Sequence, residues 1–577
     1  MPKQTLSLLT LIAVLATLLA ACGGAPAAAP TSGPAGATAA PAGGTTATGA
    51  AATTNVVQMT GLVQAFVRNF NPLIFNPLVP TRAGIYEPMM IYNAIKGELV
   101  PWLADKYEFS SDNKTLTFTL HEGVKWSDGQ PFTANDVVFT FNLFKNVTGL
   151  DGPALQAMGS NGYIDSVTAR DDRTVVFTFK QVNTAGLYDI IQQNIVPEHI
   201  WKDVTDPAKF TNDNPVGTGP FTQVTLFQPQ VYQIDKNPNY WQAGKPYVNG
   251  LRFAAYASNE QQVVAMTQGK VDWAGTFIPN VQQALLSKDS ENLHYWYPPS
   301  PQTTLLELNT TRKPFDDPVV RKAFSMALDR QRMVTVALSG YSQPADVTGL
   351  GQSPWKVADP SKLGDWTTYN SDKANQLLDE AGYKKGADGI RTTPDGKRMS
   401  FTLLMVNGFS DWISAGQIMV PNLRAIGIEL QQKMVDPGAY FGVHPSGDWD
   451  VALWFGYASP TPYHFYRNVM SKATVVPVGQ PTFANFARYA SPKADELLNQ
   501  FASTTDVNKQ KEIAAQLQQV FADEAPVIPL WPAPVYAFTS TKTFTGWPGA
   551  DNPYAYGFPQ GALYPEQLIV MTTIKPK

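Results

Sequence analysis

Hydrophobic and polar residues recur with two different periods along this chain, and each period predicts an element. A period near 3.6 predicts amphipathic helices, at residues 133–141, 259–269, 317–338, 373–381, 415–423, 494–501 and 507–524. Alternation or a short continuous apolar run predicts strands, at residues 56–66, 116–120, 174–179, 271–273, 401–405, 428–431, 449–455 and 527–531. Strands and helices alternate through the C-terminal half, which predicts an α/β protein with mixed sheets.

The N-terminal residues form a separate pattern. Lys3 is followed by an apolar run over residues 6–21, and small residues precede Cys22, the only cysteine of the chain. This order is typical of a secretory signal peptide, and the run is too short to span a bilayer comfortably, which takes about 20 residues. The pattern resembles the lipobox of bacterial lipoproteins. We therefore expect residues 1–21 to be a signal peptide and Cys22 to be lipidated; a plain secretory peptide with an incidental cysteine is the alternative.

Low-complexity sequence follows the cysteine. Residues 23–54 are almost wholly Ala, Gly, Pro and Thr and carry no charge. Such a segment has too little apolar surface to offset the entropy of ordering. We expect residues 22–56 to be the lipidated cysteine and a disordered tether, whose r.m.s. span is on the order of 30 Å. The protein would then be exported and held on the outer face of the bacterial cytoplasmic membrane, in the periplasm or at the cell surface.

Composition narrows the class of protein further. About 520 residues remain after the tether, which predicts several domains. The net charge is only −4, and the chain contains no Lys/Arg run, so nucleic acid is not an expected partner. No second apolar run reaches membrane-spanning length, so the lipid is the only expected anchor. Because Cys22 is the only thiol, the mature fold should lack disulfides and thiolate chemistry.

The sequence offers little for catalysis. The five histidines are scattered, none at helical metal-binding spacing, and no HExxH, GxSxG, GxxxxGK[ST] or GxGxxG motif occurs. Paired carboxylates such as Asp316–Asp317 or Asp448 and Asp450 leave a cell-surface glycosidase open as a distant alternative. A helix N-cap and a solvated turn explain these aspartates better. We therefore expect a binding protein rather than an enzyme, without cofactor or metal, acting as a monomer.

Five segments, in consistent order along the chain, resemble one known family. They read GELVPWLADKYE, WSDGQPFTANDV, PVGTGPF, KNPNYW and KPFDDPVVRKAFSMALDR, at residues 97–108, 126–137, 215–221, 236–241 and 313–330. These segments are similar to motifs of the family 5 extracellular solute-binding proteins, the oligopeptide, dipeptide, nickel and cellobiose receptors of ABC importers.

The resemblance implies an α/β fold, a bilobal periplasmic-binding-protein-like clamp of type II with an extra domain. Its three domains would have hinges near residues 217–219, 309–311 and 531–532, and an ABC permease would be its partner. The ligand would lie between domains I and III, whereas Trp126 and Asp136 would pack and cap. The domains would be residues 57–92, 217–310 and 532–577 (I), 93–216 (II) and 311–531 (III).

The resemblance also bears on the ligand. Peptide receptors of the family carry an aspartate that pairs with the ligand ammonium, and here Ala458 or Ser459 takes that position. A buried ammonium without a counter-charge is very unfavourable. Residues 454–466 are instead rich in aromatic side chains, which suit sugar rings. We therefore expect a cello-oligosaccharide-like ligand, with an oligopeptide or dipeptide as the alternative; nickel would need histidine ligands.

Candidate ligand contacts follow from this interpretation. Alternation places one face of a strand in the core, so about half of the aromatic candidates should only pack. From the third domain the candidates are Trp454, Tyr457, Tyr463, His464 and Tyr466, with Trp412 as an outside choice. From the first domain they are Trp273 and Asn71.

Overall fold

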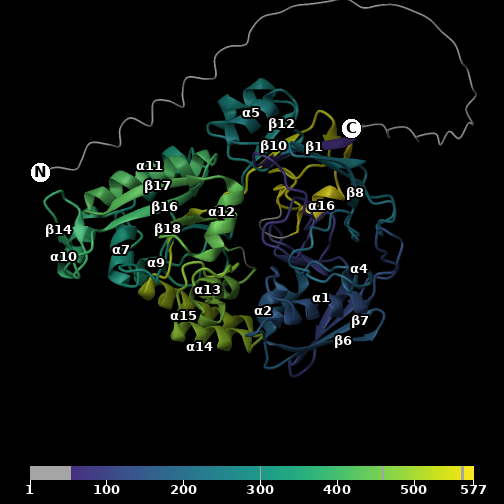
Figure 1. Cartoon of the computed structure of the whole chain (residues 1–577), viewed down its shortest axis with the longest axis horizontal. Helices are drawn as coiled ribbons and strands as arrows, with labels where there is room; N and C mark the ends of the chain where they lie inside the picture. The colour runs from purple at the N-terminus through teal and green to yellow at the C-terminus, as the bar shows by residue number, and fades with distance from the viewer. Residues whose placement is uncertain (1–53, 299, 458–459, 561–564) are drawn as a thin grey trace, which may run out of the picture. The chain divides into compact units, whose positions relative to one another are not determined.

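The computed structural model describes residues 54–298, 300–457, 460–560 and 565–577. The predicted signal peptide, the lipidation at Cys22 and nearly all of the predicted tether lie outside these residues. The described residues belong to one unit, Thr53–Lys577, and Figure 1 shows its elements. No helix in the described ranges is both long and apolar enough to cross a membrane.

A seven-stranded mixed sheet is formed by segments far apart in the sequence. Its order is β12-β20-β11-β1-β10-β9-β8. β1 runs parallel to β10 and β11, whereas the other pairs are antiparallel. The strands are β1 (Val56–Leu62), β8 (Phe221–Gln228), β9 (Val231–Lys236), β10 (Gly250–Tyr256), β11 (Trp273–Ala274), β12 (Leu293–Trp296) and β20 (Ala537–Ser540). The associated helices are α5 (Asn259–Thr267), α6 (Val281–Ala284), η2 (Leu286–Lys288) and α16 (Gln567–Met571).

A four-stranded antiparallel sheet, β4-β5-β7-β6, lies within the range 93–216. Its strands are β4 (Ala104–Phe109), β5 (Thr115–Leu120), β6 (Ile164–Asp171) and β7 (Thr174–Phe179). β5 and β7 show the predicted alternation, with every second side chain buried. Helix α1 (Ala134–Asn146) packs on β6 and β7 (Figure 1).

The start of α1 explains the WSDG motif. Thr133 and Asp136 form a capping box, which satisfies two otherwise unpaired N–H groups of the helix. The fully buried indole of Trp126 donates to Asp136 Oδ2 at 3.3 Å. Both residues therefore pack and cap, as expected.

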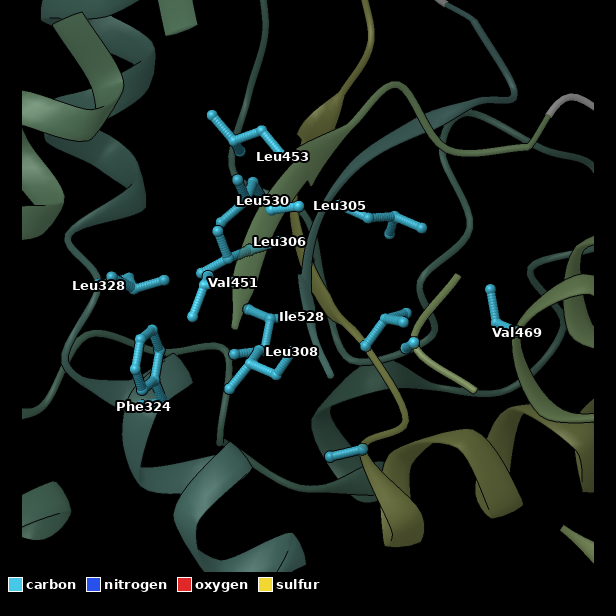
Figure 2. Close-up of a cluster of buried hydrophobic side chains, with 14 of the residues drawn as sticks. Leu305, Leu306, Leu308, Phe324, Leu328, Val451, Leu453, Val469, Ile528 and Leu530 are labelled. Atoms are coloured by element: carbon cyan, nitrogen blue, oxygen red, sulfur yellow. The ribbon is translucent and has the colours of Figure 1, made fainter. Parts of the chain in front are cut away.

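A five-stranded mixed sheet, β17-β16-β18-β13-β19, carries the largest core. Figure 2 shows leucines of β13 gathered with side chains of β18 and β19 beside Phe324 and Leu328. Helix α11 lies along β16 and β17 (Figure 1). The strands are β13 (Thr303–Leu308), β16 (Ser400–Val406), β17 (Glu429–Val435), β18 (Val451–Trp454) and β19 (Ile528–Pro532). The helices include α7 (Pro318–Met326), α11 (Ser410–Ala425), α13 (Pro462–Met470), α14 (Pro492–Ala502) and α15 (Val507–Glu524).

The strand β13 bears on the predicted domain limits. It lies in the range 217–310 predicted for the first domain, yet it pairs with β18 and β19 from the range predicted for the third. The division into three domains stays a prediction.

Shorter elements connect these sheets. They are β2 (Met90–Asn93), β3 (Glu98–Pro101), α2 (Ala154–Met158), η1 (Thr184–Gly186), α3 (Leu187–Ile191), α4 (Glu198–Trp201), α9 (Pro360–Leu363), α10 (Ser371–Glu380), β14 (Lys384–Lys385), β15 (Arg391–Thr392), α12 (Pro437–Val443), η4 (His444–Ser446), η5 (Lys472–Thr474), β21 (Phe544–Thr545) and β22 (Lys575–Pro576).

The continuous helix predicted over residues 317–338 is wrong. The structure has α7, the single turn α8 (Arg330–Arg332) and a π-helical turn η3 (Met333–Ala337). The first helix ends at Met326, and Asp329 starts the next turn because its side chain accepts from the N–H of Arg332. The break positions Arg330, whose buried guanidinium donates to Pro529 O at 2.8 Å. The spacing of apolar residues along the sequence does not reveal that the Arg330 side chain is buried.

The predicted crossing segment PVGTGPF passes very close to another backbone segment. A Cβ on Gly217 would lie 2.0 Å from Ile85 O, and one on Gly219 would lie 2.1 Å from Gly84 O. Only glycine, which lacks Cβ, permits this approach. The Gly219 N–H uses it to donate to Ile85 O at 2.9 Å.

Candidate functional site

Helices α5 and α11 bring the seven-stranded and five-stranded sheets into contact. The backbone N–H of Asn259 donates to Gly408 O at 3.3 Å, and its side-chain amide donates to Ser410 Oγ at 3.2 Å. Thr276 fixes the same asparagine by donating to its Oδ1 at 2.9 Å. We call the region around Asn259, Gly408 and Ser410 the α5–α11 junction.

Aromatic rings gather on the seven-stranded side of the junction. Phe277 lies 5.5 Å from the Tyr536 ring and 6.0 Å from the Tyr341 ring, and Tyr295 is stacked on Tyr536 at 6.1 Å. The Tyr295 hydroxyl donates to Thr276 O at 2.9 Å. The Tyr536 hydroxyl is buried and has no hydrogen-bond partner among the described residues. This side therefore presents rings together with one unused phenol.

A second aromatic set lies at the start of α11. Trp412 is 4.7 Å from Phe455 and 5.3 Å from Phe409, and it also packs edge-on against Tyr440. Trp412 itself is almost fully buried, whereas Phe409 and Phe455 are half-buried. The exposed parts of this set therefore come from the two phenylalanines.

Asp411 precedes Trp412 of the second aromatic set. It is half-buried in the first turn of α11 and forms no ion pair among the described residues. Desolvation raises the pKa of its carboxyl to about 6, partly offset by the Trp412 N–H, and the charge of Glu260 on α5 raises it further. Burial raises the pKa of Tyr295 and Tyr536, and the charge of Asp411 raises both further.

Sequence reasoning missed Asp411. An acid was sought close to residues 458–459 along the chain, whereas Asp411 belongs to another segment. The available signal was an acid flanked by aromatic residues in GFSDW, next to Trp412.

Trp454 ends β18 and lies on a stack of rings. The His444 ring is 4.7 Å from it at an interplanar angle of 14°, and Trp449 and Tyr440 continue the stack. The buried His444 Nε2 lies 2.8 Å from Glu307 Oε2. The Trp454 indole N–H has no partner among the described residues. The Trp454 ring is therefore held nearly parallel to the His444 ring and half-buried, and its indole N–H is an unused hydrogen-bond donor.

The remaining aromatic candidates of this segment are buried. Tyr457 is stacked on Phe486 at 6.0 Å. On α13, Tyr463 is stacked on Phe501 at 5.9 Å, and Tyr466 donates its hydroxyl to Thr348 O at 2.8 Å. Contact of these residues with a ligand stays a prediction.

His464 belongs to a buried ionic cluster on α13. Its Nε2 lies 3.4 Å from Asp189 Oδ1. Arg467 binds the same carboxylate in a bidentate way, at 2.6 and 3.0 Å. Burial by itself raises the pKa of Asp189, but the charges of Arg467 and His464 hold it well below its usual range. Burial lowers the pKa of His464, so the ion pair that joins α3 to α13 is formed by Asp189 and Arg467.

Trp273 and Asn71 have their polar groups bound by protein. The Trp273 indole donates to Gly557 O at 2.6 Å, and its ring packs on Trp547. The Asn71 amide donates to Pro207 O and Phe210 O, both at 2.8 Å. Both side chains are fully buried, and no ring contact or hydrogen bond in the described part of the chain joins them to the other candidates. Their role in ligand binding stays a prediction.

No group of three or more His, Cys, Asp or Glu suited to a metal ion occurs in the described ranges. The site residues thus provide aromatic faces, hydrogen-bonding groups and one unpaired carboxylate. Such a set can hold a polar organic solute, and it contains no nucleophile paired with a base.

Comparison with known proteins agrees with this arrangement. Residues 98–475 match the bacterial extracellular solute-binding proteins, family 5 Middle. The glutathione-binding protein GsiB of Escherichia coli strain K12 is 29% identical over 439 residues, 74% of this chain and 79% of that protein.

Solved structures are also similar. The mannohexaose-bound periplasmic oligopeptide-binding protein of an ABC transporter from Thermotoga maritima has a TM-score of 0.83 at 27% identity, covering 92% of this chain and 100% of that chain. The oligopeptide-binding protein AppA of Bacillus subtilis, in complex with a nonapeptide, has a TM-score of 0.76 at 22% identity, over 90% and 98% of the two chains. The latter supports the fold alone.

The fold and the site thus define a periplasmic-binding-protein type of receptor with mixed α/β sheets. The chain belongs to the family 5 extracellular solute-binding proteins. It is the substrate-binding component of an ABC importer, acts outside the cytoplasm and is not catalytic. The predicted family, fold class and non-enzymatic role are confirmed, and the glycosidase hypothesis is set aside.

Proposed function

We propose that the chain is the receptor of an ABC importer for an oligosaccharide, which it captures between its lobes and delivers to the permease. The carrying observation is the α5–α11 junction, which has an aromatic set on each side and, on α11, a carboxylate without an ion pair among the described residues. Flat rings bind the C–H faces of sugars, and carboxylates and phenols bind their hydroxyls.

Similarity to the mannohexaose-bound protein supports this ligand class. That protein is also named an oligopeptide-binding protein, so a family name does not decide between sugar and peptide. Glutathione binding by the GsiB relatives keeps a short peptide as the second candidate. The position expected to bind a peptide ammonium carries no acid in this sequence, which favours the sugar.

The anchor belongs to the same proposal. Lipidation of Cys22 and a tether up to about residue 56 would hold the receptor near its permease at the outer face of the cytoplasmic membrane. Stable anchoring takes more than one acyl chain. The feature to verify is therefore a Cys22 that carries acyl chains and forms the N-terminus of the processed protein.

A thermal-shift screen tests the ligand class. The purified chain is heated with mannohexaose, cello- and xylo-oligosaccharides, and separately with glutathione and di- to pentapeptides. Ligand at a hundredfold excess over Kd stabilises the folded state by about 2.7 kcal/mol. Stabilisation by an oligosaccharide is the expected result. Stabilisation by peptides alone would refute the sugar assignment.

A further inference from the structure

Asp411 and Tyr536 lie on opposite sides of the α5–α11 junction, and neither has its polar group fully used. Ser410, next to Asp411, accepts from Asn259. Thr276 donates to the same asparagine and accepts from Tyr295, whose ring is stacked on Tyr536. The Tyr536 side chain is 9% exposed, and its buried hydroxyl has no partner among the described residues. A buried unpaired hydroxyl is unfavourable by about 1–3 kcal/mol. Asp411 comes from the five-stranded side, on α11, whereas Tyr536 precedes β20 of the seven-stranded sheet.

The two groups have complementary requirements. An ionised carboxylate only accepts hydrogen bonds, and a phenol beside it has a proton to donate. A sugar hydroxyl can donate to the one and accept from the other. An ammonium group has three donors and no acceptor, so it could donate to Asp411 and to the phenol oxygen but would offer no acceptor for the phenolic proton. The pair therefore favours hydroxyl groups over an ammonium.

The surroundings fit a ring that carries these hydroxyls. Phe277 and Tyr295 pack against Tyr536, and Phe409, at the start of α11 two residues before Asp411, packs against Phe455. The other charged group facing Asp411 is Glu260 on α5, which is also acidic. No basic side chain is available in the described residues to neutralise Asp411, so its hydrogen-bonding capacity is left for a ligand.

We propose that Asp411 and Tyr536 form a polar subsite that binds adjacent hydroxyls of one sugar ring, between the aromatic sets of the two sheets. This inference rests on the proposed function and specifies which residues bind the hydroxyl groups of the ligand. It assigns Asp411 as the acceptor and Tyr536 as the donor. Because they come from opposite sides of the junction, ligand bound to both would hold the two sides together.

Isothermal titration calorimetry with mannohexaose and cellohexaose tests the subsite. Asp411→Asn keeps the shape but removes the charge, and hydrogen bonds to charged groups are stronger than neutral ones. We expect about tenfold or greater loss of affinity in Asp411→Asn, and about two- to tenfold loss in Tyr536→Phe. Asp372→Asn is the matched control, since Asp372 is an exposed acid in the first turn of α10; it should bind as the wild type does.

Thermal melting of the unliganded variants separates binding from folding. Burial raises the pKa of Asp411 above its unfolded value, so its ionisation disfavours the folded state at neutral pH. Asp411→Asn should therefore melt no lower than the wild type at pH 7.5. A lower melting temperature together with lost binding would indicate a structural role and overturn the subsite.

The titrations also separate this inference from the proposed function. Wild-type oligosaccharide binding that is unchanged in Asp411→Asn and Tyr536→Phe would overturn the subsite alone. Peptide binding by the wild type that is lost in Asp411→Asn would assign the carboxylate to an ammonium and overturn the hydroxyl assignment. No oligosaccharide binding by the wild type would overturn the proposed function and the subsite with it.

Discussion

Replacing Asp189 by asparagine should weaken the contact between α3 and α13. In the wild type the Asp189 carboxylate binds the Arg467 guanidinium at 2.6 and 3.0 Å, and the two side chains are only 6% and 9% exposed. The neutral amide leaves the Arg467 charge buried without its counter-charge. Removing one partner of a buried ion pair is destabilising by about 3–5 kcal/mol.

The molecule can avoid this loss without unfolding completely. α3 adjoins the four-stranded sheet, whereas α13 belongs with the five-stranded sheet. Separation of these two segments would return Arg467 to water. We therefore expect local opening at α3 and α13, favoured by about a hundredfold or more since 1.4 kcal/mol is tenfold, and little change in the core around β13.

Hydrogen exchange read by mass spectrometry measures this opening. Peptides covering α3 and α13 should exchange faster in Asp189→Asn, whereas peptides of β13 and β18 should exchange as in the wild type. Because the pKa of Asp189 is lowered, the pair stays ionised from pH 6 to pH 8, and the effect should be equal at both.

The control variant is Asp388→Asn, which breaks the exposed pair of Asp388 with Arg398. Exposed pairs contribute little, so this variant should exchange as the wild type does. Equal exchange of Asp189→Asn and wild type at α3 and α13 would refute the reasoning about the buried pair.

Four further predictions follow from single groups. Gly217→Ala places a Cβ 2.0 Å from a backbone carbonyl, so it should lower the yield of folded protein and the melting temperature. His444→Ala removes the ring that hydrogen-bonds Glu307 and supports the Trp454 stack; the free energy of unfolding in urea should fall by about 3–5 kcal/mol, as for truncation of other large buried rings. Oligosaccharide affinity should be constant above pH 7 and fall as the pH drops through about 6, where Asp411 becomes protonated, with a flat profile in Asp411→Asn. Cys22→Ser should release the protein from membranes in cell fractionation and leave ligand affinity unchanged.

Much of the fold could be predicted from local pattern. Alternation located β5 and β7, and the Thr133–Asp136 spacing located the start of α1. These features depend on neighbours a few residues apart, so the sequence displays them directly. The long helix over residues 317–338 failed because its break depends on Asp329 and on the burial of Arg330, which arise from tertiary contacts.

The candidate site was harder to predict. Trp412 and Trp454 were proposed as ligand contacts because they belong to aromatic segments, but their packing partners come from elsewhere in the chain. Asp411 and Tyr536 are separated by more than a hundred positions and belong to opposite sides of the α5–α11 junction. No local pattern marks such a pair. Asn71 and Trp273 looked polar or aromatic enough for a site, yet the fold engages their polar groups with backbone carbonyls.

Calorimetric titration of the purified chain with mannohexaose and cellohexaose, and in parallel with glutathione and a pentapeptide, tests the central claim most directly. An oligosaccharide receptor should bind the sugar saturably with one site per chain and should give no heat of binding with either peptide. Saturable binding of a peptide, with none of mannohexaose or cellohexaose, would contradict the account.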